Sequence, residues 1–94
     1  MPPGAPSNLV AVAVSGTQIN LTWSYTPSGE TALSVWRASG GRGFVLVGVV
    51  GPGSTSYQDR WVTPGTSYTY EVRAVNDYVA SPWSNLASAT TPAG

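Results

Sequence analysis

Apolar and polar residues alternate with a period of two along most of this chain, and short groups of turn-forming residues interrupt the alternation. A period of two is the spacing of a half-buried β-strand, whereas a helix repeats roughly every 3.6 residues. Residues 17–25 show the pattern, with Ile19, Leu21 and Trp23 on one face and polar residues between them. We therefore predict a fold made mainly of β-strands, with Trp23 buried in its core.

Seven strands are predicted, because groups of glycine, proline, serine and asparagine break the alternation at intervals typical of all-β domains. One strand, third in order, contains the inward-facing Leu33 and Val35. The other six cover residues 9–14, 17–25, 44–50, 55–59, 67–76 and 83–90. Because no helical period persists, the pattern predicts an all-β fold, a seven-stranded immunoglobulin-like β-sandwich with Greek-key topology.

The segment around residue 65 carries the most specific local pattern. Pro64 fixes a φ suited to the second position of a turn, and Gly65 accepts a positive φ. Tyr68 follows at the start of a strand, where its ring can be buried while its hydroxyl reaches back to a carbonyl of residues 60–63. This arrangement is the tyrosine corner of β-sandwiches. Pro64, Gly65 and Tyr68 are therefore expected to have structural roles.

This region resembles the fibronectin type III family, whose motif is leucine, any residue, Pro-Gly-Thr, any residue and tyrosine, followed by an Ala-Val-Asn strand end. The chain departs from the motif only at Val62, which stands in place of leucine. Further matching segments are Pro6-Ser7-Asn8-Leu9, Ile19-Asn20-Leu21-Thr22-Trp23, Thr55-Ser56-Tyr57-Gln58-Asp59, Ser81-Pro82-Trp83-Ser84-Asn85 and Ala89-Thr90-Thr91-Pro92. The resemblance implies one sheet of the first, second and fifth strands and a second sheet of the other four.

Charge and residue usage exclude several functions. Four arginines balance four acids and lysine is absent, so the net charge of 0 offers no electrostatic site for nucleic acid or an anionic membrane. Histidine and cysteine are absent too, which leaves the serines and threonines without an activating base or thiol chemistry. We therefore expect no enzymatic activity, no catalytic residues, no metal site and no cofactor.

Both ends of the 94-residue chain have the composition of linkers between modules. Residues 1–5 are predicted to be an N-terminal linker, residues 6–91 one domain and residues 92–94 a C-terminal linker. Met1 ahead of Pro2-Pro3-Gly4 suggests a module cut from a larger protein, or an engineered derivative of one. The resemblance is strongest to modules of bacterial extracellular enzymes that degrade polysaccharides. It implies a monomeric, secreted or cell-surface spacer whose partners are neighbouring domains.

Surface aromatic residues support an alternative function, a module that binds a polysaccharide or a protein. The inward parity of Leu33 and Val35 places Trp36 on the outer face of its sheet, where Arg73 is expected beside it. Trp83 follows a Ser-Pro step, and Arg73 can stack on either indole. The same residues could equally form a local surface contact without any ligand.

Two further aromatic residues lie in predicted loops. Trp61 occupies a position that is commonly glycine in the family, so it is expected either to cover the end of the core or to contact a neighbouring module. Tyr78 is predicted at a loop tip, where a tyrosine can serve recognition at low entropic cost. A third alternative is an engineered binding scaffold that uses the loops 26–30, 51–54 and 77–81.

Overall fold

Seven antiparallel strands arranged as two sheets make up the fold, in agreement with the sequence-based prediction. The structure is a computed structural model and describes residues 4–26, 29–76 and 79–93. The strands are β1 (Ser7–Ser15), β2 (Gln18–Ser24), β3 (Ala32–Ser39), β4 (Val45–Val50), β5 (Ser56–Asp59), β6 (Ser67–Val75) and β7 (Ala87–Thr90). Across these three ranges, no helix has the length and apolar character needed to cross a membrane.

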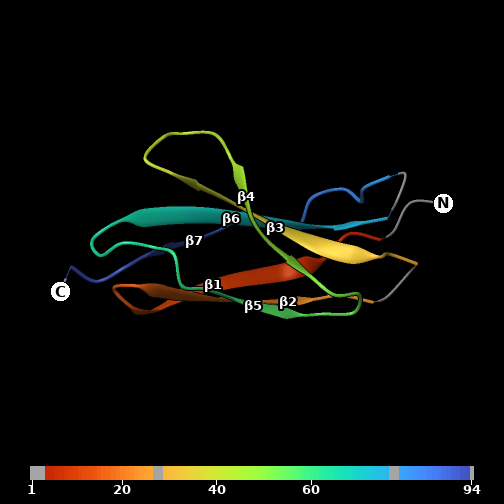
Figure 1. Ribbon diagram of the computed structural model, residues 1–94, viewed down its shortest axis with the longest axis horizontal. Coiled ribbons are helices and arrows are strands. Elements are labelled where there is room, and N and C mark those ends of the chain that lie inside the picture. Colours follow the sequence, from red (N-terminus) through yellow and green to blue (C-terminus); the bar gives the residue numbers. More distant parts are fainter. Residues whose placement is uncertain (1–3, 27–28, 77–78, 94) are drawn as a thin grey trace.

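The two sheets contain the strands that the family resemblance implied for them. One sheet has the strand order β1-β2-β5 and the other β4-β3-β6-β7. Figure 1 shows the sheets as two layers, with the two ends of the chain at opposite ends of the molecule. The Cα trace measures 45 × 22 × 18 Å along its principal axes, so the sandwich is more than twice as long as it is wide.

The core lies between the two sheets and is built mainly from alternate residues of β1, β2, β3 and β6, as the pleat of a β-strand requires. Its most deeply buried members are Leu9, Ile19, Leu21, Trp23, Leu33, Val35, Val62, Tyr68, Tyr70, Val72 and Ala74. Trp23 is 5 % exposed, and its indole Nε1 donates a hydrogen bond of 3.0 Å to the carbonyl of Ser54. The single polar atom of this large side chain is therefore satisfied in the core.

The last strand is shorter than the predicted strand over residues 83–90, because regular pairing with β6 begins only at Ala87. Before that point the hydroxyls of Ser81 and Ser84 accept hydrogen bonds of 2.9 Å from the amides of Ala74 and Val72. Side-chain oxygens therefore take the place of carbonyls on the edge of β6. Pro82 cannot donate to a ladder, and it lies within this irregular stretch.

Tyr68 occupies the expected corner, but its hydroxyl bonds differently from the prediction. It accepts a hydrogen bond of 3.0 Å from the amide of Thr63 and lies 3.1 Å from the Thr63 hydroxyl, so its main-chain partner is an N–H and not a carbonyl. Burial raises the pKa of Tyr68, yet the bonds with Thr63 and the nearby Arg37 bring it below its ordinary value. Gly65 has a φ of 65°, and its amide donates to the carbonyl of Pro92.

Candidate interaction surface

The outer face of the four-stranded sheet carries three of the candidate residues. Leu33 and Val35 of β3 are fully buried, so Trp36 points to the opposite side of the sheet. In the ladder between β3 and β6, Trp36 lies opposite Glu71, and Ser34 lies opposite Arg73. Arg73 is therefore the diagonal neighbour of Trp36 on this face, at a separation that a long side chain can bridge.

Trp83 joins this face through the irregular segment that precedes β7. The amides of Ser81 and Ser84 donate to the carbonyls of Ala74 and Val72, with N–O distances of 2.7 and 2.8 Å. Together with the two serine hydroxyls, these bonds attach the segment to β6 at two points on either side of Trp83. The Trp83 side chain, which is 39 % exposed, therefore comes to lie over Arg73.

Trp36, Arg73 and Trp83 form a closely packed group that we call the aromatic clasp. The Arg73 guanidinium carbon lies 4.3 Å from the Trp83 ring centroid and 5.6 Å from that of Trp36. The two indoles meet edge to face, with centroids 5.8 Å apart and ring planes at 89°. The Trp36 Nε1 donates a hydrogen bond of 3.0 Å to the hydroxyl of the buried Ser34. Each member of the clasp is thus held by another part of the same chain.

The geometry of the clasp favours internal packing over the stacking of a flat ligand. Two coplanar, open ring faces would suit a sugar chain, but these indoles are perpendicular and Arg73 lies over Trp83. The buried Nε of Arg73 has no hydrogen-bond partner among the described residues. Burial raises the pKa of the neighbouring Glu71, which Arg73 only partly offsets. Arg73 therefore acts here mainly through its contacts with aromatic rings.

The other two candidate aromatics lie outside the clasp. Trp61 is 81 % exposed and does not cover the end of the core, so the first of its two predicted roles is wrong. Val62 is buried there instead, while the Trp61 amide donates to the Asp59 carboxylate and its indole points to solvent. Tyr78 lies outside the described residues, as does part of its predicted loop.

A buried polar cluster that the sequence analysis missed links the two sheets. Asp59 of β5 is fully buried, and its Oδ2 accepts bonds of 2.8 Å from both Arg37 of β3 and the Tyr70 hydroxyl of β6. The Arg37 guanidinium also lies 5.1 Å from the Tyr68 ring centroid. Burial and the bond to Asp59 raise the pKa of Tyr70 far above its ordinary value. The alternation of residues along β3 could have indicated this cluster, because it places Arg37 on the same inward face as Leu33 and Val35.

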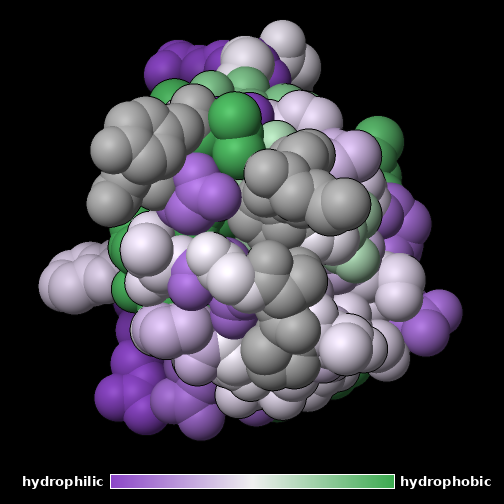
Figure 2. All heavy atoms as spheres, turned by 90° about the vertical axis from the view of Figure 1, so that its right-hand side faces the viewer, coloured by the Kyte–Doolittle hydropathy of each residue, from purple (hydrophilic) through white to green (hydrophobic). Residues whose placement is uncertain are grey.

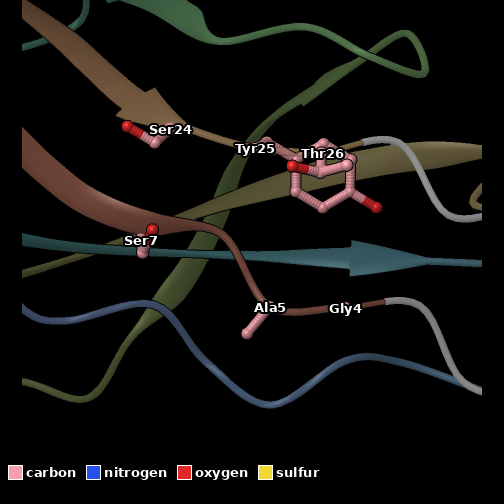
Figure 3. Close-up of a pocket in the computed structure, with 6 residues that line it drawn as sticks. All are labelled: Gly4, Ala5, Ser7, Ser24, Tyr25 and Thr26. Carbon is pink, nitrogen blue, oxygen red and sulfur yellow. The ribbon is translucent and has the colours of Figure 1, made fainter.

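A small hollow of about 300 Å³ lies near the start of the chain, between the beginning of β1 and the end of β2. Figure 3 shows the residues that line it, which are Gly4, Ala5, Ser7, Ser24, Tyr25 and Thr26. The Tyr25 hydroxyl already donates to Glu30, and the other side chains carry no charge. Figure 2 views this end of the molecule, where the described atoms are mostly hydrophilic or neutral and the hydrophobic areas are small and separate.

Chemistry that needs several converging ionisable groups has no support in the described ranges. No three histidine, cysteine, aspartate or glutamate side chains come together there as metal ligands would. Asp59 binds Arg37 and Tyr70, and Glu30 accepts bonds from Tyr25 and the amide of Gly53. These two carboxylates hold structure together.

Comparisons with known proteins agree with this architecture. The model of the fibronectin type III domain matches residues 4–90. A gellan lyase from Bacillus sp is 36 % identical over 91 residues, and an alpha-amylase from Niallia circulans is 32 % identical over 95 residues. These alignments cover 96 % and 98 % of this chain but 4 % and 7 % of the two enzymes. The chain therefore spans less than a tenth of either curated relative.

Solved structures show the same fold over nearly the whole chain. A crystal structure of an Fn3-like protein from Clostridium thermocellum is 34 % identical with a TM-score of 0.79, covering 98 % of this chain and 96 % of that one. A crystal structure of domains from titin is 26 % identical with a TM-score of 0.82, covering 97 % of this chain and 32 % of that one.

Proposed function

Since the chain belongs to the fibronectin type III family, we propose that it is a non-catalytic spacer between neighbouring domains of a larger, secreted polysaccharide-degrading enzyme. The observation that carries this proposal is the position of the chain ends. The two ends lie at opposite ends of a sandwich whose long axis is 45 Å (Figure 1). Domains attached at the two ends would be held apart by the full length of the sandwich.

The type of parent protein is proposed from the relatives. A gellan lyase and an alpha-amylase each contain a region similar to this chain, which accounts for only a small part of their length. A polysaccharide outside the cell is too large to cross the membrane, so an enzyme that degrades it has to be secreted. An accessory module in such an enzyme needs no active site of its own, which suits a chain without histidine, lysine or cysteine.

Trp61 is the residue that we assign to contact with a neighbouring domain. Thr91 donates a hydrogen bond of 2.6 Å to the carbonyl of Thr63, which attaches the last part of the chain to the loop that contains Trp61. An exposed tryptophan is a frequent anchor of protein interfaces. A domain joined to this end would therefore meet Trp61, which is 81 % exposed, close to the junction.

Spin labels at the two ends test the spacer function. The chain has no cysteine, so a Ser7→Cys, Thr90→Cys variant can be labelled at these two exposed sites alone, at the start of β1 and the end of β7. We expect a single narrow distance distribution of the same order as the 45 Å long axis. The width of the distance distribution decides the outcome. A flexible chain of this length has a similar mean end-to-end distance, about 50 Å, but a broad distribution. A broad distribution would contradict a spacer that holds its neighbours at a fixed distance.

A further inference from the structure

An open groove of about 470 Å³ lies beside the turn that joins β3 to β4. It exists because the two strands end at different points. β3 continues to Ser39, pairing with β6, whereas β4 begins only at Val45, which lies opposite Arg37. Residues 40–44 therefore leave the sheet and form the raised loop at the upper left of Figure 1.

A tight turn sets the position of this loop. Gly40 and Gly41 have φ values of 58° and 77°, and the Arg42 amide donates a bond of 3.0 Å to the Ser39 carbonyl. Two successive positive φ values between the residues that such a bond joins define a type I′ turn, which glycine adopts at little cost. The turn directs the chain back toward the sheet at Arg42, so that Arg42 and Phe44 line the groove.

The groove combines an aromatic ring, an aliphatic side chain and several hydroxyls. Phe44 is 36 % exposed on the side of the loop and Leu86 is 60 % exposed on the side of β7. Ser67 and Thr69 line it from β6, and their hydroxyls lie 2.7 and 2.9 Å from those of Thr90 and Ser88. A hydroxyl both donates and accepts, so these pairs can bond further hydroxyl groups.

Arg42 gives the groove its charge. The other three arginines are engaged, since Arg37 binds Asp59, Arg60 bonds to Gln58 and Arg73 lies against two indoles. Among the described residues, Arg42 is the arginine whose guanidinium makes no hydrogen bond, ion pair or ring contact. An exposed arginine is ordinary by itself, but this one lines a groove whose other side chains are all uncharged. The groove therefore presents one unneutralised positive charge.

We propose that this groove binds a uronic acid residue of an acidic polysaccharide. The guanidinium of Arg42 has the fork geometry that pairs with a carboxylate through two hydrogen bonds. The apolar face of the sugar ring would pack on Phe44, and its hydroxyls would reach Ser67 and Thr69. A volume of 470 Å³ is in the range of small-ligand sites, and the open shape leaves room for a polymer chain to continue on both sides.

That the ligand is a sugar and not some other carboxylate rests on the proposed function. That the ligand is an anion rests on Arg42 alone. The two proposals can therefore fail separately. The distance between spin labels at the chain ends involves no ligand, and binding in the groove does not depend on any neighbouring domain.

Titration of the ¹⁵N-labelled domain with a galacturonic acid oligosaccharide and with its methyl-esterified form tests the groove, since the two ligands differ mainly in charge. We expect the acidic form to bind and to shift the amide resonances of Gly40, Gly41 and Thr69, and the ester to bind roughly tenfold more weakly or worse. Arg42→Gln should remove the difference between the two ligands. Arg60→Gln removes the same charge at a site directly after β5 that does not line the groove. It should leave the difference between the two ligands unchanged.

Four results would overturn the proposal. These are equal affinity for acid and ester, no binding at millimolar ligand, shifts that map outside the groove, and unchanged acid binding in Arg42→Gln. Sodium acetate provides a further test, because binding as tight as that of the oligosaccharide would indicate a simple anion site without sugar recognition. Arg42 is exposed, so the Arg42→Gln variant should fold like the parent domain. The amide spectrum of the variant checks this.

Discussion

Replacement of Asp59 by alanine is expected to lower the free energy of unfolding by about 3–5 kcal/mol, the cost of removing one partner from a buried ion pair. The substitution leaves the Arg37 guanidinium, whose side chain is only 19 % exposed, without its counter-ion. It also removes the acceptor of the Tyr70 hydroxyl and of the Trp61 amide. Because β3, β5 and β6 meet at this carboxylate, its loss should weaken the contact between the two sheets.

The midpoint of chemical denaturation measures this effect. Gln58→Ala is the matched control, since Gln58 precedes Asp59 in the same strand and is exposed. A surface substitution of this kind usually changes the free energy of unfolding by no more than about 0.5 kcal/mol. Equal midpoints for Asp59→Ala and Gln58→Ala would contradict the inter-sheet role of the carboxylate.

Trp23→Ala is expected to lower the free energy of unfolding by about 3–5 kcal/mol as well, in this case by leaving a cavity in the core. Trp23 is 5 % exposed and packs between the sheets, so the space of the indole cannot be filled without movement of both. The carbonyl of Ser54 also loses the hydrogen bond that it accepts from the indole.

Trp61→Ala provides a control with the same change of side chain. Trp61 is 81 % exposed, so its replacement in the isolated domain should alter stability by no more than about 0.5 kcal/mol. Similar unfolding midpoints for Trp23→Ala and Trp61→Ala would show that the core is not where the structure places it.

The strands could be predicted from the sequence because they depend on local patterns, whereas their assignment to two sheets came from the resemblance to the fibronectin type III family. Alternation placed Ile19, Leu21 and Trp23 on one face, and the structure buries all three. The same parity placed Trp36 on the outer face of β3, where it lies diagonal to Arg73. Period-two patterns specify which side of a sheet a residue occupies, and burial of one side then enforces that choice.

What could not be predicted depends on contacts between segments far apart in the chain. The bonds of Asp59 with Arg37 and Tyr70 require the packing of one sheet on the other. The perpendicular arrangement of Trp36 and Trp83 depends on how the segment before β7 attaches to β6. Alternation gives the face of a side chain but neither the angle of its ring nor the identity of its partner.

Titration of the isolated domain with insoluble cellulose and with chitin, followed by tryptophan fluorescence, tests the central claim most directly. That claim is that the aromatic clasp is internal packing in a spacer and not a binding platform. Because Trp36, Arg73 and Trp83 are engaged with one another, we expect no saturable binding to either neutral polymer. Saturable binding that is lost in Trp36→Ala, and also in the more exposed Trp83→Ala, with both variants folded, would contradict the account.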